Sequence, residues 1–232
     1  EGDVIGSDSS GVVTKVGAGV TGFEIGDNVS SFSHGGYAND KFAGSFQQYA
    51  IYDAVTTLKY GELKKYDGKD TIDSFENAST VTLGLSTVGM SLSAQFGLDP
   101  TKKYPNDWIF ILAGTSATGI LAIQVAKKMF GLKVVTTANP KYNDYLTSLG
   151  ADVVVNSRSD DVIGEIKKAT NDDVKYALDT VSTKPTFNLA NEALRTNGDA
   201  FLDNLMVLQP DQLDSIKPNV KISGTLVYLV VG

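Results

Sequence analysis

The second half of the chain alternates short apolar runs with stretches of helical spacing. The six runs are 108–112, 133–137, 152–155, 174–178, 200–207 and 220–231. Helix-like segments lie between the first five of them, near 118–130, 140–149, 160–169 and 184–195. Continuous apolar strands separated by helices are typical of right-handed βαβ units in a buried parallel sheet. The pattern therefore predicts an α/β fold with a doubly wound, six-stranded parallel sheet of the Rossmann type.

The first half of the chain has a different pattern, with strand-like segments separated by glycines. Residues 11–17 alternate apolar and polar side chains, and 27–32 and 45–52 also have the composition of strands. Residues 74–97 have helical spacing. This half therefore predicts a small β-rich unit and a helix that leads into the parallel sheet.

Composition and charge narrow the classes of function. The 232 residues include 27 acidic and 20 basic side chains, a formal net charge of −7. Because no basic cluster offsets this charge, we expect no nucleic-acid partner. No apolar run approaches the roughly 18 residues that cross a bilayer, so we expect no membrane association and a cytoplasmic location. Cysteine is absent and His34 is the only histidine, so we expect no metal site.

The segment after the first apolar run, AGTSATGILAIQVAKK at 113–128, has the position of a dinucleotide-binding loop. In such loops the pyrophosphate rests on the N-terminus of the first helix. The glycine pattern is incomplete, because Ser116 stands between Gly114 and Gly119 where a second glycine is usual. The serine hydroxyl can bond a phosphate oxygen. Taken alone, the pattern fits an ordinary strand-to-helix turn equally well, and the six-strand context favours the cofactor loop.

The end of the second apolar run indicates which nucleotide would bind. An NAD site usually has an Asp or Glu there, which bonds the ribose 2′-hydroxyl. Residues 136–142, TTANPKY, contain no acid and offer hydroxyls, an amide and the cation of Lys141. This composition favours NADP(H), because an acid would repel its 2′-phosphate. The alternative is that Lys141 is only a solvated side chain at the start of a helix.

Five segments together carry a family resemblance. They are GSDSSGVVTKVGAGVTGFEIGDNV (6–29), GSFQQYA (44–50), AGTSATGILAIQVAK (113–127), SLGADVVVN (148–156) and ALDTVS (177–182). They resemble the medium-chain dehydrogenase/reductase superfamily, and its zinc-independent quinone oxidoreductase and enoyl reductase branch fits best. VKISGTLVYL (220–229) is similar to a segment of the fungal toxD-like reductases. Zinc-dependent members carry Gly-His-Glu where this chain has Gly6-Ser7-Asp8.

The resemblance also implies a domain organisation. It assigns residues 1–77 to part of a GroES-like catalytic domain and residues 78–232 to a Rossmann NADP(H)-binding domain. Relatives have strands before the first of these segments and continue beyond the last, so we expect a fragment that lacks both ends. Members are often dimers paired through the last Rossmann strand, here about 220–230, so a homodimer is expected.

The residue pattern and the resemblance together assign the cofactor-binding positions. These are Thr87, Gly114, Ser116, Ala117, Thr118, Gly119, Thr137, Asn139, Lys141, Tyr142, Thr180, Val181, Leu205, Met206 and Tyr228. Tyr228 and the neighbouring residues to Val230 are expected to end a late strand near the nicotinamide.

The implied chemistry is hydride transfer from a reduced nicotinamide to a quinone, an enone or an aldehyde. Tyr37, Tyr49 and Tyr228 are candidate proton donors, although a tyrosine is more often a packing residue. His34, in a glycine-flanked loop, is a candidate for lining the substrate entrance, and a solvated histidine is the alternative. A second function class is also open: an NADPH-binding protein without turnover, with a structural or stress-related role.

Overall fold

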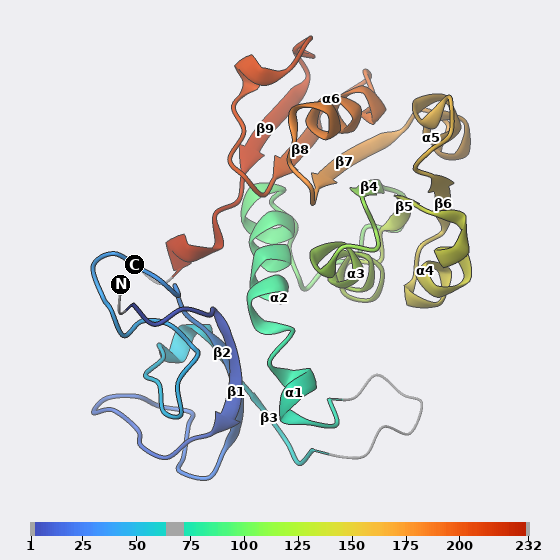
Figure 1. The fold of residues 1–232 in the computed structure, drawn as a ribbon. Helices are drawn as coiled ribbons and strands as arrows, with labels where there is room; N and C mark the ends of the chain where they lie inside the picture. The colour runs from blue at the N-terminus through green and yellow to red at the C-terminus, as the bar shows by residue number, and fades with distance from the viewer. Residues whose placement is uncertain (1–2, 64–71, 231–232) are drawn as a thin grey trace. The chain divides into compact units, whose positions relative to one another are not determined.

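The computed structural model describes residues 3–63 and 72–230, and contacts divide the chain into two compact units (Figure 1). The first unit comprises Glu1–Ser86 with Val227–Gly232, and the second comprises Thr87–Leu226. The domain boundary that the resemblance implies, between residues 77 and 78, stays a prediction. Contacts alone keep residues 78–86 with the first unit.

The first unit is built on a three-stranded antiparallel sheet in the order β1-β2-β3. Its elements are β1 (Asp8–Val12), β2 (Asn28–Phe32), η1 (Ala54–Thr56), β3 (Thr57–Tyr60) and α1 (Phe75–Ala78). The strand expected at 27–32 is confirmed. The strand expected at 11–17 begins earlier than predicted and ends at Val12, so only two of its residues lie in β1.

Residues 45–52 form no strand, so that prediction is wrong. Side chains in this segment bond to backbone groups instead. Gln47 Nε2 donates to the carbonyl of Gly44 at 2.7 Å, and Ser45 Oγ donates to that of Ser7 at 2.6 Å. Such side-chain bonds offer the backbone an alternative to a regular strand ladder.

The helix expected over 74–97 is present but interrupted. It divides into α1, α2 (Thr82–Gly89) and a π-helical segment, η2 (Met90–Gln95). Residues 79–81 separate α1 from α2, and the hydroxyls of Ser79 and Thr80 donate to carbonyls three residues back. These bonds compete with continuation of the helix.

The second unit is built on a six-stranded parallel sheet in the order β6-β5-β4-β7-β8-β9, which confirms the predicted Rossmann sheet. The strands are β4 (Trp108–Leu112), β5 (Lys133–Ala138), β6 (Val153–Asn156), β7 (Val174–Asp179), β8 (Ala200–Asn204) and β9 (Val220–Gly224). The helices are α3 (Ala117–Gln124) with its π-helical continuation η3 (Val125–Met129), η4 (Pro140–Tyr142), α4 (Asn143–Leu149), α5 (Val162–Thr170), α6 (Lys184–Ala193) and η5 (Pro210–Gln212).

Two strands end earlier than their apolar runs predict. β8 stops at Asn204, and β9 stops at Gly224, after which the chain enters the 3-10 helix η6 (Val227–Val230). Thr225, directly after β9, is still bonded to the end of β8. Its N–H donates to the carbonyl of Asn204 at 2.8 Å, and its hydroxyl donates to the carboxylate of Asp203 at 2.7 Å.

The central strand β4 has apolar packing on both faces. Ile109 and Ile111 belong to a core cluster that includes residues of α3 and α4, whereas Phe110 and Leu112 belong to one that includes residues of α5 and α6 (Figure 1). All four side chains are buried. Burial on both faces explains why this strand reads as a continuous apolar run.

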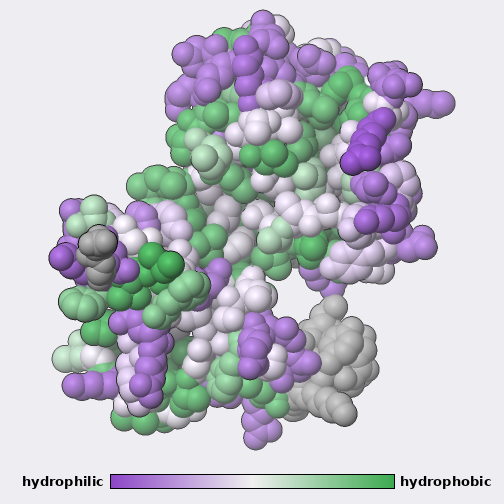
Figure 2. Space-filling model, viewed as in Figure 1, coloured by the Kyte–Doolittle hydropathy of each residue, from purple (hydrophilic) through white to green (hydrophobic). Residues whose placement is uncertain are grey.

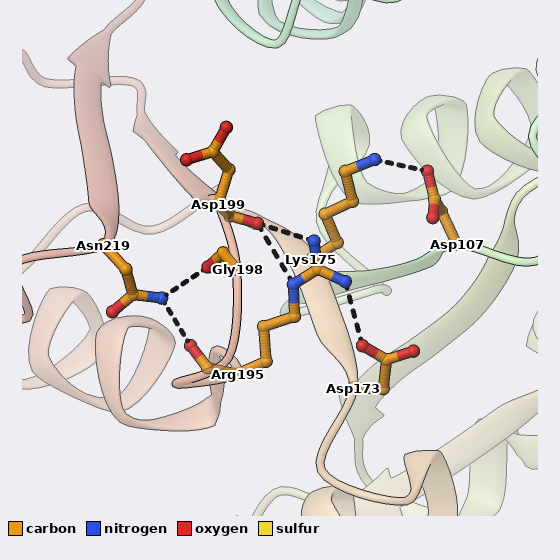
Figure 3. Close-up of polar contacts among 7 residues, drawn as sticks. All are labelled: Asp107, Asp173, Lys175, Arg195, Gly198, Asp199 and Asn219. Carbon is orange, nitrogen blue, oxygen red and sulfur yellow. Dashed lines mark hydrogen bonds and ion pairs between the residues drawn. The ribbon is translucent and has the colours of Figure 1, made fainter.

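Charged side chains hold the amino ends of the strands together (Figure 3). Arg195 donates from Nε and Nη2 to the carbonyl of Asp199, at 3.0 and 2.7 Å, and from Nη1 to the carboxylate of Asp173 at 2.9 Å. Lys175 of β7 pairs with Asp107, just before β4, at 2.8 Å. Ligands of open parallel sheets bind at the opposite, carboxyl end, which these bonds leave free.

The carboxyl end of the sheet carries unusual backbone conformations. Ala113, Ser182 and Val207 follow β4, β7 and β8 with φ angles of +58°, +58° and +54°. At the end of β9, a Cβ on Gly224 would lie 2.7 Å from the Cα of Val207, so only glycine fits there. Left-handed non-glycine residues cost energy and tend to cluster at functional sites. They indicate this edge of the sheet as the candidate site.

Apolar burial differs between the two units. Both large clusters of buried apolar side chains lie in the second unit. The first unit leaves several large apolar side chains exposed, and Figure 2 shows hydrophobic surface on part of its visible face. These side chains include Ile5, Phe42, Phe46, Tyr49 and Ile51. Substitutions in the second unit are therefore expected to change the free energy of unfolding most.

Candidate functional site

The loop from β4 to α3 turns sharply at Ala113 and is held by the end of β5. The N–H of Ala113 donates to Thr137 Oγ1, and the N–H of Gly114 donates to the Thr137 carbonyl, both at 3.1 Å. These two bonds fix the loop against the neighbouring strand. The first turn of α3 therefore starts from a defined position.

Both glycines of the loop are required by packing. A Cβ on Gly114 would lie 2.3 Å from Thr136 Oγ1, and a Cβ on Gly119 would lie 2.5 Å from the carbonyl oxygen of Ala113. Both distances are shorter than real Cβ contacts. The loop and the first turn of α3 thus approach each other as closely as the predicted glycine pattern requires.

Ser116 is the N-cap of α3. Its backbone is extended and its Oγ accepts a hydrogen bond from the N–H of Gly119 at 2.9 Å. The same Oγ lies 2.8 Å from Oγ1 of Thr180, directly after β7. Ala117 and Thr118 carry the first two N–H groups of α3, which an α-helix leaves without an intrahelical acceptor.

The end of β5 presents an amide and a cation. Asn139 Oδ1 accepts a hydrogen bond from the N–H of Lys141 at 3.1 Å and so caps η4. Lys141 Nζ lies 4.8 Å from the centroid of the Tyr142 ring, within the range of a cation–π contact. No carboxylate occurs in residues 136–142. This strand end therefore presents one cation and no anion within residues 136–142.

Asp179 organises the end of β7. Its Oδ1 accepts hydrogen bonds from the N–H groups of Val181 and Ser182, at 3.0 and 2.9 Å, and its Oδ2 accepts one from Thr186 Oγ1 at 2.8 Å. Burial raises the pKa of the Asp179 carboxyl above its ordinary value, and these hydrogen bonds oppose the rise. Ser182 Oγ in turn accepts from the N–H of Leu205 at 2.8 Å, which joins the end of β7 to that of β8.

Most of the predicted cofactor positions lie along one edge of the second unit. The strands β5, β4, β7 and β8 are neighbours, and the residues within two positions of their carboxyl ends include Gly114, Asn139, Thr180 and Leu205. Val181 and Met206 are exposed beside them. Thr87 lies elsewhere in the second unit, in α2, and is largely buried.

Tyr228 is not at the end of a strand, which corrects that prediction. It lies in η6, within the first unit, and its hydroxyl is 2.9 Å from Ser7 Oγ. The His34 ring stacks on it with 4.0 Å between centroids, and Tyr37 stacks on His34 at 4.9 Å. Tyr49 is exposed over 69% of its surface. The structure thus brings two of the three candidate tyrosines together, around His34.

The contacts of Ser7 and His34 could not be predicted from the sequence. Both lie far along the chain from Tyr228, and the local pattern around His34 is only that of a glycine-rich loop. The one signal was Ser7 itself, which stands where zinc-dependent relatives have histidine.

The part of the chain that the structure describes holds neither a cluster of metal ligands nor a membrane-spanning helix. Within residues 3–63 and 72–230, no three His, Cys, Asp or Glu side chains gather closely enough to hold a metal ion. In the same part of the chain, no helix combines the length and apolarity needed to cross a membrane.

Comparison with known proteins identifies the family to which the chain belongs. The chain matches the alcohol dehydrogenase GroES-like domain over residues 2–62 and the zinc-binding dehydrogenase family over residues 117–229. It is 32% identical over 234 residues to the trans-enoyl reductase TOXD of Cochliobolus carbonum, an alignment that covers 100% of this chain and 73% of that protein. The chain spans between 64% and 73% of the length of five curated relatives.

Solved structures share the fold at lower identity. An alcohol dehydrogenase superfamily protein from Novosphingobium aromaticivorans matches with a TM-score of 0.77 and 20% identity, over 99% of this chain and 63% of its own. Mycobacterial Rv1454c, solved in complex with NADPH, matches with a TM-score of 0.72 and 22% identity, over 98% of this chain and 66% of its own. The resemblance seen in the sequence is confirmed: the chain belongs to the medium-chain dehydrogenase/reductase superfamily.

Proposed function

We propose that the protein is a zinc-independent, NADPH-dependent oxidoreductase that transfers a hydride to an activated C=C or C=O acceptor, such as an enone, a quinone or an aldehyde. The observation that carries the proposal is the acid-free end of β5, with Lys141 over Tyr142, beside the glycine-bounded loop that starts α3. The trans-enoyl reductase activity named for TOXD supports the choice of acceptor class.

The residues at the carboxyl edge fit an NADP(H) molecule. Gly114 and Gly119 hold the β4–α3 loop in a conformation that a Cβ at either position would prevent. The N–H groups of Ala117 and Thr118 are available at the start of α3 for the pyrophosphate. Lys141, Asn139 and Tyr142 would hold the 2′-phosphate. When bound, the reduced nicotinamide supplies the hydride, and the protein supplies orientation and a polar surround.

The chain's side chains also support the absence of catalytic zinc. It contains no cysteine and a single histidine, His34. The His34 ring stacks on the rings of Tyr37 and Tyr228. Ser7, at the place of a zinc-ligating histidine, bonds to Tyr228 instead. Tyr228 and Tyr37 are retained as candidate proton donors. The homodimer through the last strand stays a prediction, for which β9 at the edge of the sheet is suitable.

NADPH is expected to bind at least about tenfold more tightly than NADH, a difference of about 1.4 kcal/mol. Replacing Lys141 with alanine should bring that ratio close to one, because the variant loses the cation that pairs with the 2′-phosphate. Fluorescence titration of both nucleotides measures the two dissociation constants. The matched control is Lys133→Ala, since Lys133 also lies over an aromatic ring, that of Trp108, but at the amino end of β5.

Equal affinity of the unaltered protein for NADPH and NADH would show that the end of β5 does not select the 2′-phosphate. If Lys141→Ala leaves the ratio of the NADPH and NADH dissociation constants unchanged, Lys141 is only a solvated surface cation.

Turnover distinguishes the enzyme from an NADPH-binding protein without activity. We expect the full-length protein to oxidise NADPH steadily with at least one acceptor in a panel of enones, quinones and aldehydes. The loss of nicotinamide absorbance measures this oxidation. Tight NADPH binding without turnover on any acceptor would favour the structural or stress-related role. Turnover that survives dialysis against a chelator, with no metal detected in the protein, would support zinc independence.

A further inference from the structure

The hydrogen bonds around Ser116 have a fixed direction. The N–H of Gly119 can only donate, so Ser116 Oγ accepts from it at 2.9 Å. The carbonyl of Leu112 can only accept, so Thr180 Oγ1 donates its one proton there, at 2.7 Å. The remaining 2.8 Å contact between the two hydroxyls must therefore use the proton of Ser116, which donates to Thr180.

We propose that Thr180 is a positioning residue for the nucleotide, acting through Ser116. The relay runs from Gly119 through Ser116 and Thr180 to Leu112, so it joins the first turn of α3 to the ends of β7 and β4. It fixes the rotamer of the N-cap and with it the direction of the Ala117 and Thr118 N–H groups. This inference rests on the proposed function, because those groups matter only if they bind a pyrophosphate.

The relay also changes the role expected for Ser116. Its only proton is committed to Thr180, and one lone pair accepts from Gly119, so the hydroxyl has no second proton for a phosphate oxygen. Anion recognition then falls to the backbone N–H groups, which the relay aims before the ligand arrives. Preorganised donors bind more tightly because less freedom is lost on binding.

The relay further explains how serine replaces the usual glycine. Ser116 has an extended backbone, with φ of −67° and ψ of 157°, which needs no glycine. A side chain of this size is accommodated because its hydroxyl has partners on two sides. Thr180, in the loop after β7, thus allows a serine at position 116, where dinucleotide-binding loops usually have glycine.

The test is the replacement of Thr180 by valine, which keeps the side-chain volume and removes the hydroxyl. We expect Thr180→Val to weaken NADPH binding about tenfold, since Ser116 loses its acceptor and the α3 N-terminus becomes less ordered. Thr180→Ser should restore most of the affinity because it restores the relay. Adenosine 2′-monophosphate, which lacks the pyrophosphate, should bind both variants and the unaltered protein equally in a competition assay.

A matched control separates positioning from general destabilisation. Thr170 is likewise a threonine whose hydroxyl donates to a backbone carbonyl, that of Ile166 in α5, at 2.8 Å, and it is more buried than Thr180. Thr170→Val should lower stability by a similar amount in urea unfolding and leave both dissociation constants unchanged. The double variant Ser116→Ala with Thr180→Val should bind NADPH no more weakly than Ser116→Ala alone, because both changes break one relay.

Three results would overturn the inference, and they are distinguishable. If the unaltered protein does not bind NADPH, the proposed function fails and the inference fails with it. If it binds NADPH but Thr180→Val binds equally well, only the inference fails. If Ser116→Ala and Thr180→Val weaken binding additively, Ser116 contacts the phosphate by itself and the relay is not the cause.

Discussion

Replacing Gly119 with alanine is expected to weaken NADPH binding by at least about 100-fold, or about 2.7 kcal/mol. The added Cβ would lie 2.5 Å from the Ala113 carbonyl oxygen and 2.8 Å from Ser116 Oγ. Because the first of these atoms belongs to the backbone, the loop or the first turn of α3 must move. Either movement displaces the Ala117 and Thr118 N–H groups and separates Gly119 from its cap. Isothermal titration with NADPH measures the loss.

Gly89→Ala is the matched control. Gly89 ends α2 with ordinary helical φ and ψ, and a Cβ there would meet no atom outside its own helix within 4 Å. This variant should bind NADPH normally and be slightly more stable, by about 0.5 kcal/mol, because alanine has less freedom to lose on folding. Normal NADPH affinity in the Gly119→Ala protein would show that the close approach of loop and helix is not needed for binding.

The second large effect is expected at Asp179. Asp179→Ala should lower the free energy of unfolding by about 2–4 kcal/mol, because three hydrogen bonds to one buried carboxylate are lost and their donors are left unpaired. Urea unfolding followed by circular dichroism gives the value. Asp214→Ala is the control, since Asp214 is exposed and its carboxylate pairs with exposed Lys184 at 3.0 Å; it should change stability by less than about 0.5 kcal/mol.

The pH dependence of Asp179→Asn tests the state of the carboxyl itself. Burial raises the pKa of Asp179 above the ordinary value of 3.8, so the folded protein binds this proton more tightly than the unfolded chain does. The stability that Asp179 contributes is therefore greatest at pH below 3.8 and is lost as pH rises through the raised pKa. The asparagine variant has no such proton. The free energy of unfolding of the unaltered protein minus that of Asp179→Asn should therefore increase as the solution is acidified from neutral pH. A difference that does not change with pH would contradict the raised pKa.

The core of the second unit could be predicted well from sequence because its central strands β5, β4, β7 and β8 are mostly buried on both faces. Runs such as WIFIL at 108–112 appear as uninterrupted apolar stretches, and they recur between helices at the spacing of βαβ units. The glycines at 114 and 119 were also informative, since their positions reflect a close approach that no other residue permits. The apolar runs and the two glycines are enough to locate the β4–α3 loop and the end of β5 along the sequence.

Other features depend on contacts between distant residues, which periodicity does not encode. The apolar run at 220–231 was predicted as one strand, yet β9 ends where Thr225 reaches Asp203. Residues 45–52 were predicted as a strand from their composition, and side chains in this segment bond to backbone groups instead. The stacking of His34 on Tyr228 and the bond between Ser116 and Thr180 join segments far apart in sequence. Such pairs form only when the chain folds, so the local sequence pattern does not reveal them.

The packing of Gly224 against Val207 limits the order in which substitutions can accumulate over evolution. A Cβ at position 224 collides with the main chain of Val207, whatever side chain position 207 carries. Glycine at 207 would relax the left-handed backbone there, with φ of +54°, and would remove the contacts with the Val207 side chain, but the 2.7 Å contact with the Cα of residue 207 would remain. A lineage can therefore acquire a side chain at 224 only after the loop that follows β8 has been rebuilt, so in an ancestral reconstruction the change in the loop must come first.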